Sequence, residues 1–304
     1  MDIWVVVAGL IVGFVVGLTG MGGGALMTPL LVIVFGVTPL TAVSSDLVAA
    51  LAMKPVGGGL HLRRGTVHRG LVLWLALGSV PAAFVGAVIL DRFAGPQLAE
   101  GMKVLLGAVL LVAATAMVLR TALLRRRGVP VADPAIPLER RVPVRPVATL
   151  VVGVVGGLIV GLTSVGSGSL MIVALMLLYP NLTTAELVGT DLVQAIPLVG
   201  AAALGHLFFG SVEFGLTAAL LVGGIPGVWV GAHLSSRANT AIVRPALVAV
   251  LLLSGAKLLG ASNPVLLAGA IAACLGVAAS VVRGRLAGGP KTVPVALAEV
   301  VAGD

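Results

Sequence analysis

Two short stretches decide how this chain folds: residues 17–24 read GLTGMGGG and residues 161–168 read GLTSVGSG. Each stretch follows a long apolar run and precedes a short one. Further along, Asp46-Leu47-Val48 recurs as Asp191-Leu192-Val193 at nearly the same spacing. Other matched pairs are His61 and His206, Gly65 and Gly210, Gly78 and Gly223, Pro81 and Pro226, Gly86 and Gly231, and Arg92 and Arg237. So many matches at one spacing indicate that the chain contains two copies of one unit.

The composition places both copies in a membrane. Of 304 residues, 59% are hydrophobic and only 10% are charged, whereas an ordinary soluble domain carries about 25% charged residues. This composition excludes soluble enzymes, secreted disulfide scaffolds and nucleic-acid-binding domains. The single cysteine, Cys274, also excludes a disulfide framework and a multi-cysteine metal site.

The apolar runs predict an all-α polytopic membrane protein. They are longer than the strands of a membrane β-barrel, which have about ten residues of alternating polarity. Glycine, proline or charged residues bound each run. The runs cover residues 3–19, 25–36, 42–60, 70–90, 99–119, 147–163, 169–180, 186–208, 214–234, 242–260 and 264–282.

Each copy holds five runs, and its second run is short. Run 25–36 would form a helix about 18 Å long, which is less than a bilayer core of about 30 Å. Whether the short run crosses the bilayer or re-enters, each copy crosses an odd number of times. An odd unit inserts its second copy upside down, so we predict two inverted-topology repeats with broken helices after the Gly/Ser-rich stretches.

The positions of the basic residues predict which side of the membrane each loop faces. Basic residues outnumber acidic ones by 19 to 11, and many arginines lie with prolines in segment 120–146. Such a segment cannot continue a helix, and basic loops are usually cytoplasmic; binding of lipid or a partner is the alternative role. We expect a first membrane repeat at 1–119, a cytoplasmic linker at 120–146, a second repeat at 147–260, an extra transmembrane helix at 261–282 and a cytoplasmic tail at 283–304.

The repeated G-L-T stretches, the breaks after them, and the D-L-V and late histidine of each copy resemble the sulfite exporter TauE/SafE family, also called the toluene-sulfonate uptake permeases. The resemblance covers both halves and most of the chain. It implies a secondary carrier in the plasma membrane for a small anion such as sulfite, sulfoacetate or an aryl sulfonate.

The two breaks are the first candidate for a substrate site. Backbone N–H groups at a helix start lack helical partners, and glycine lets an anion approach them closely. Close helix packing is the alternative role, and it is the one expected of Gly13, Gly17 and Gly86. The candidate substrate-binding residues of the breaks are Thr19, Gly20, Gly22, Gly23, Gly24, Thr163, Ser164, Gly166, Ser167, Gly168 and Ser169.

The second break differs from the first by three hydroxyl groups. Ser164, Ser167 and Ser169 replace two glycines and an alanine of the first copy. Substrate contacts from the two halves are therefore not expected to be symmetric.

Asp46 and Asp191 are acidic residues within apolar surroundings. Ionisable residues at membrane depth usually face a cavity or a partner, and burial favours the uncharged carboxyl group. Both are therefore candidates for coupling transport to protons near neutral pH. The alternative is a helix N-cap at the start of the third run of each copy, because serine, threonine and aspartate are good capping residues.

Four further polar residues are candidates. His61 and His206 could bind protons or donate to an oxyanion, and an interfacial position is their alternative. Lys54 could attract an anionic substrate, although its side chain could also extend to the membrane surface. Gln194 lies one turn after Asp191 and adds a polar group to the same helix.

The sequence contains no nucleophile–base–acid set, no phosphate-binding loop with lysine and no paired metal ligands. We therefore expect no enzyme activity, cofactor or metal. The leading hypothesis is a secondary carrier in the plasma membrane, whose partners are a small anion, the lipid bilayer and coupling protons, with no nucleic acid. The alternatives are an anion channel and a non-transporting membrane accessory protein.

Overall fold

The computed structural model describes residues 2–19, 23–92, 96–127, 138, 142–234, 240–266 and 268–269. In this part of the chain the regular elements are all helices, which confirms the predicted fold class. They are α1 (Ile3–Thr19), α2 (Gly24–Ile33), α3 (Pro39–Arg63), α4 (Arg69–Arg92), α5 (Pro96–Arg127), α7 (Pro146–Thr163), α8 (Leu170–Leu178), α9 (Thr184–Phe209), α10 (Phe214–Leu234) and α11 (Thr240–Leu258). Gly20 and Gly22 of the first break, most of the predicted helix 261–282 and the tail 283–304 lie outside the described residues.

The helix lengths fit a multi-pass membrane protein. Within the described residues, five helices are long and apolar enough to cross a membrane, and they are α4, α5, α7, α9 and α10. By contrast, α2 has 10 residues and α8 has 9. A helix of this length reaches only about 15 Å, half of a bilayer core. The second run of each copy is therefore a half-helix.

One boundary differs from the prediction. Helix α5 continues to Arg127, so the first part of segment 120–146 is helical. The first proline of that segment is Pro130, and the arginines and leucines before it are good helix formers. As a result Arg120, which was expected in a cytoplasmic linker, is a buried helical residue with 8% of its surface exposed.

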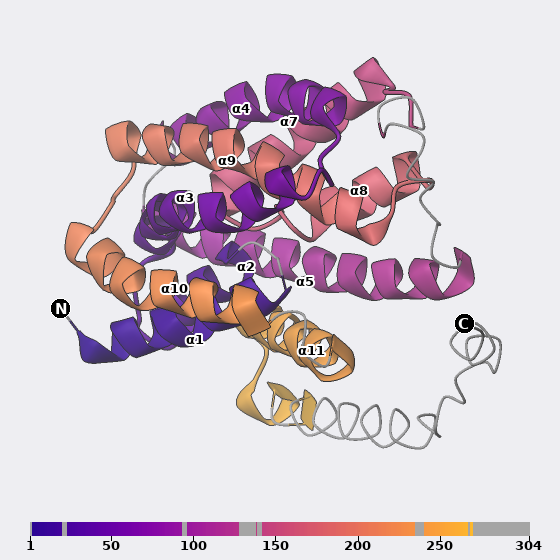
Figure 1. Ribbon diagram of the computed structural model, residues 1–304. Helices are drawn as coiled ribbons and strands as arrows, with labels where there is room; N and C mark the ends of the chain where they lie inside the picture. The colour runs from indigo at the N-terminus through magenta and orange to yellow at the C-terminus, as the bar shows by residue number, and fades with distance from the viewer. Residues whose placement is uncertain are drawn as a thin grey trace, which may run out of the picture.

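The two halves of the chain interlock (Figure 1). Helix α1 of the first half packs along α10 of the second half, and α4 of the first half packs along α7 of the second. Because α1 corresponds to α7 and α4 to α10 in the repeat, the same pair forms twice with the halves exchanged. Helix α3 packs on its own counterpart, α9, and these two helices join the pairs.

Glycines bring the backbones of each pair into contact, and we call these two contacts the glycine seams. A Cβ on Gly13 would overlap the backbone of Gly224 on α10, and a Cβ on Gly157 would overlap the backbone of Ser79 on α4. Small residues spaced by four let membrane helices approach closely, which promotes their association. Gly17 likewise lies against the backbone of α10, and Gly86 lies against the backbone of α7. The packing role expected of Gly13, Gly17 and Gly86 is therefore confirmed.

The contacts also give the helix directions. Along each seam, successive glycines of one helix contact successive residues of the other helix in the same N-to-C order. The paired helices are therefore parallel. Helices α3 and α9 are antiparallel, because Ser44 meets His206 near one end and Gly58 meets Ile196 towards the other. Counterpart helices that run in opposite directions are what inverted repeats require.

A basic turn lies toward one end of the molecule, on the right of Figure 1. The turn between α3 and α4 carries Arg63, Arg64 and Arg69. Beside it, Nε2 of His68 donates to the backbone oxygen of Val142, just before α7, at 2.7 Å. The start of α1 and the turn between α9 and α10 lie at the opposite end.

We predict that Gly157→Ala destabilises the protein, because the added Cβ overlaps the backbone of Ser79. Overpacking of this kind typically costs about 1–3 kcal/mol. The matched control is Gly59→Ala in α3, where nothing lies within 4 Å of an added Cβ. Because alanine is the better helix former, this control should leave the melting temperature in detergent unchanged or raise it. Equal melting of the two variants would contradict the seam's role.

Candidate functional site

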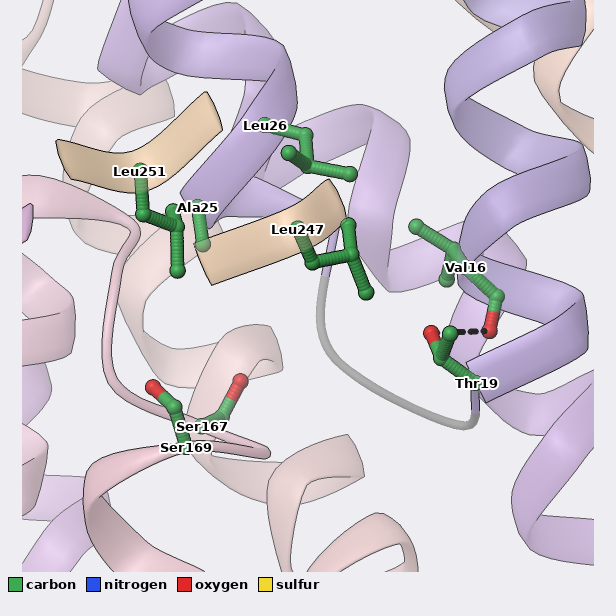
Figure 2. Close-up of a pocket in the computed structure, with 8 residues that line it drawn as sticks. All are labelled: Val16, Thr19, Ala25, Leu26, Ser167, Ser169, Leu247 and Leu251. Carbon is green, nitrogen blue, oxygen red and sulfur yellow. Dashed lines mark hydrogen bonds between the residues drawn. The ribbon is translucent and has the colours of Figure 1, made fainter. Parts of the chain in front are cut away.

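A pocket lies between the two halves, beside the second break (Figure 2). Ser167 and Ser169, in the loop between α7 and α8, form its polar side and point into it. Its cavity volume is about 10 Å³, which is the space of about one water molecule. The remaining lining residues come from α1, α2 and α11 and are Val16, Thr19, Ala25, Leu26, Leu247 and Leu251. A ligand would therefore meet two hydroxyl groups on one side and mainly apolar side chains on the others.

Lys54 of α3 places its ammonium group directly behind the polar side of this pocket. Its Nζ donates to Oγ of Ser167 at 2.8 Å, and only 8% of the residue is exposed. Because that Oγ accepts from Lys54, the Ser167 hydroxyl hydrogen can be donated to a ligand. Oγ of Ser169 is buried and has no hydrogen-bond partner. Lys54 thus stays inside the protein, and the pocket has two hydroxyl donors backed by a positive charge.

The backbone N–H groups at the start of α8 are not free, contrary to expectation. The carbonyl oxygen of Gly166 accepts from Ser169, Leu170 and Met171 at 3.1–3.4 Å. Gly166 has φ of +131°, and Gly168 has φ of +91°. Both values suit glycine and not L side chains. The sequence therefore needs glycine here to fold the loop back under the helix.

The first break is simpler in its described part. The carbonyl oxygen of Gly23 accepts from Leu26 and Met27 at 2.9 Å, and Gly23 itself has a helical φ of −62°. An added Cβ on Gly23 would touch only the side chain of Val16, at an ordinary contact distance. Neither backbone strain nor a close approach requires glycine at this position.

Asp46 joins the first half to the second break. Its Oδ2 accepts from Oγ1 of Thr28 at 2.9 Å and from Oγ of Ser164 at 2.7 Å. Ser164 ends α7 in the left-handed region, with φ of 59°. Gly24, the first residue of α2, lies so close to Ser164 that a Cβ would overlap it. The two breaks therefore meet at this carboxylate.

Asp191 has a different environment from its counterpart. Both aspartates are buried, and Oδ1 of each has no hydrogen-bond partner, so the difference lies in the groups around them. The groups that face its carboxylate are Lys54, the backbone N–H of Gly168, and Arg120. Two carboxylates and two cations thus share the interior of the protein around the pocket.

Neither aspartate caps a helix, so that alternative is wrong for both. Helix α3 already begins at Pro39. Helix α9 is capped by Thr183, whose side chain accepts from the backbone of Glu186 while that residue's carboxylate accepts from the Thr183 N–H. Asp46 and Asp191 therefore lie inside their helices, where a buried carboxylate needs another reason to be present.

The hydroxyl groups just before the two aspartates bind helix starts of the opposite half. Oγ of Ser45 accepts from the backbone N–H of Glu213 at 3.1 Å. In the equivalent position, Oγ1 of Thr190 accepts from the backbone N–H of His68 at 3.0 Å. Ser45 and Thr190 therefore do act as helix caps, but each caps a helix of the opposite half and not its own.

The two histidines are not equivalent. His206 is fully buried, and its Nε2 donates to the carbonyl oxygen of Gly161 at 2.8 Å while Nδ1 pairs with Oγ of Ser44 at 2.8 Å. The interfacial alternative is therefore wrong for His206. His61 is half-buried at the end of α3, and its Nδ1 pairs with Oγ1 of Thr66 at 2.9 Å. Both residues lie away from the pocket lining.

The other predicted polar residues bind within the framework. Nε2 of Gln194 donates to Oγ of Ser79 at 2.9 Å, on a glycine seam, while its Oε1 has no partner. Thr163 donates to the carbonyl oxygen of Ile159, four residues earlier in its own helix. Thr19 also donates within its own helix and lines the pocket.

Two residues of this site were not predicted from the sequence. Thr28 was read as part of an apolar run, and only its partner Asp46 reveals its role. Arg120 was grouped with the linker arginines. Four residues without charge separate it from Arg125, and that one-turn gap is the signal that could have placed it inside the membrane.

Residues 5–258 match the family described as "Sulfite exporter TauE/SafE". A protein of Bacillus subtilis named "Probable membrane transporter protein YjnA" is 41% identical over 85% of this chain and 100% of its own length. A second protein of the same organism, "Probable membrane transporter protein YdhB", is 24% identical over 82% of this chain and 96% of its own length. A "Probable membrane transporter protein" of Xylella fastidiosa is 29% identical over 76% of this chain and 83% of its own length. No solved structure matches the chain at a significant level.

We predict that Thr28→Val destabilises the protein, because it removes one of the two hydroxyl donors to the buried Asp46 carboxylate. A buried polar group that loses its partner typically costs about 1–3 kcal/mol. Thr115→Val is the matched control, since that exposed hydroxyl only donates within its own helix. Melting in detergent should be lowered by the first substitution alone. A melting temperature of Thr28→Val equal to the wild-type value would show that the contact adds little.

Proposed function

Because the chain belongs to the sulfite exporter TauE/SafE family and is a multi-pass membrane transporter, we propose that it is a secondary carrier of small sulfur oxyanions. Its substrate binds in the pocket between the halves, against Ser167 and Ser169. The observation that carries this proposal is the buried ammonium group of Lys54, bound to the Ser167 hydroxyl at the back of that pocket.

The electrostatics of the pocket support an anionic substrate. A buried positive charge is costly unless a negative charge compensates it. The hydroxyl of Ser169 has no partner in the protein, and the hydroxyl hydrogen of Ser167 is available as well. An oxyanion with several acceptor oxygens can take both hydrogen bonds while it compensates the lysine.

The distribution of polar and apolar residues around the pocket supports a sulfonate. The side opposite the serines is lined by Leu247, Leu251 and Leu26. A sulfonate carries its charge at one end and carbon at the other, so it can satisfy both sides at once. Sulfite lacks the carbon group, and sulfoacetate carries a second charge that the leucines would not bind. We therefore rank an organic sulfonate first among the three substrate types.

Transport by this proposal follows alternating access with protons as the coupling ion. The pocket lies where the repeats meet, which is the usual place of the substrate site in carriers built from inverted repeats. Asp46 and Asp191 are the proton-binding candidates because both are buried beside the site. In the plasma membrane, the end with the basic turn would face the cytoplasm, together with the linker and the tail.

We predict that Lys54→Met lowers sulfonate flux in proteoliposomes at least tenfold, because it removes the charge behind the pocket; one lost interaction of about 1.4 kcal/mol already gives this factor. The flux panel comprises toluenesulfonate, sulfoacetate, sulfite and thiosulfate, each with and without a pH gradient. The matched control is Lys103→Met, whose ammonium group forms an exposed ion pair with Glu100. That variant should transport like the wild type.

The same panel separates the alternatives. A carrier shows saturation and exchange of labelled anion, whereas a channel shows flux proportional to concentration and no exchange. An accessory protein shows no flux with any anion. Normal flux in a well-folded Lys54→Met variant would place the site elsewhere.

A further inference from the structure

The two aspartates occupy equivalent positions in the repeat, yet the protein holds them differently. Asp46 accepts from two hydroxyl groups, of Thr28 and Ser164, at 2.9 and 2.7 Å. Among the described residues Asp191 has no such hydroxyl donor, and its carboxylate instead faces the backbone N–H of Gly168 and the cations Lys54 and Arg120. Oδ1 of both aspartates is buried without a hydrogen-bond partner. A buried carboxylate in this state is not fully compensated by its surroundings. The two carboxylates therefore differ in their partners: two hydroxyl groups hold Asp46, whereas a backbone N–H of the substrate loop and two cations surround Asp191.

Asp191 shares its partners with the pocket. Lys54, which is bound to Ser167, lies within electrostatic range of Asp191 as well as Asp46. The backbone N–H of Gly168 also faces Asp191, and Gly168 lies between the two serines of the pocket. The negative charge next to the substrate loop is thus the protein's own carboxylate.

We propose that the Asp191 carboxylate and the substrate anion compete for Lys54 and the loop of residues 166–169, so that the anion binds when Asp191 carries a proton. This inference rests on the proposed function and assigns its coupling residue. Asp46 then has a positioning role, since it keeps the two breaks together. No bond to the anion forms: one proton enters Asp191 when the anion binds and leaves when the anion is released.

None of the other charged and titratable groups described around Asp191 is as well placed to bind the coupling proton. Lys54 of α3 and Arg120 of α5 face the carboxylate as cations. Helix α8, which follows the loop, contains no titratable residue. Just before α4, His68 binds the neighbouring Thr190 through its backbone N–H, and its ring nitrogens bind the backbone of Val142 and Leu71.

On α3 and α9 themselves, the remaining acidic and histidine side chains have partners of their own, and Arg63 is exposed at the end of α3. Asp46 is bound by hydroxyl groups of α2 and of the second break. His61 pairs with Thr66, and His206 pairs with Ser44 and Gly161. Glu186 completes the N-terminal cap of α9.

The experiment measures binding of toluenesulfonate to the purified full chain in detergent as a function of pH. Toluenesulfonate keeps its charge between about pH 5 and pH 8, so a change in affinity reports on the protein. If one proton must bind with the anion, the dissociation constant rises by up to about tenfold per pH unit at the alkaline end. Proton uptake on binding is followed in the same samples with an indicator dye.

In the wild type we expect this pH dependence and an uptake approaching one proton per bound anion at alkaline pH. Asp191→Asn removes the competing charge, so it should bind toluenesulfonate at about pH 8 at least tenfold more tightly than the wild type, without pH dependence or proton uptake. The matched control, Asp46→Asn, should keep both the pH dependence and the uptake. Melting without ligand shows that each variant is folded.

Three results would overturn the inference. They are unchanged pH dependence in Asp191→Asn, weaker binding by Asp191→Asn at every pH, and loss of pH dependence in Asp46→Asn. If the wild type binds toluenesulfonate with the same affinity at every pH, the competition is absent although the proposed substrate site stands. If it binds none of the four anions of the flux panel, the proposed function fails with it.

Discussion

The structure depends on one constraint, which is that broken helices inside a membrane must have their ends covered by protein. Lipid offers no hydrogen bonds, so irregular backbone at membrane depth is tolerated only where it is buried or lines a cavity. Helices α2 and α8 are half-helices, and each follows a break. The glycine seams meet this constraint because they let the helices of opposite halves approach to backbone contact. The breaks then meet each other, at Gly24 and Ser164, in the interior.

Most of the fold could be predicted because it follows from periodic and repeated features of the sequence. The duplication, the apolar runs and the short second run are properties of the chain alone, and run 214–234 coincides with α10. The end of α5 could not be placed in this way, because arginine is a good helix former and also the residue of cytoplasmic loops. Only packing decides between these roles, and it buries Arg120.

The candidate site could be predicted only in part. The breaks, Lys54 and the two aspartates were found because polar residues are rare in such a chain and therefore conspicuous. Their partners could not be found, since they come from distant segments: Lys54 binds Ser167, and Asp46 binds Ser164. The repeat also made Asp46 and Asp191 equivalent candidates for proton coupling. The halves have diverged at the breaks, where serines replace glycines, and this divergence gives Asp46 and Asp191 different surroundings.

The glycine seams have a consequence for how the chain is made. The two seams are alike in space, but their parts are synthesised at different times. Ser79 meets Gly157 soon after the linker has been completed, whereas Gly13 has to wait for Gly224, close to the end of the second repeat. Domains assemble from the N-terminus as they are synthesised. Helix α1 therefore inserts first and finds its partner last, and until α10 arrives its row of glycines faces lipid or another protein.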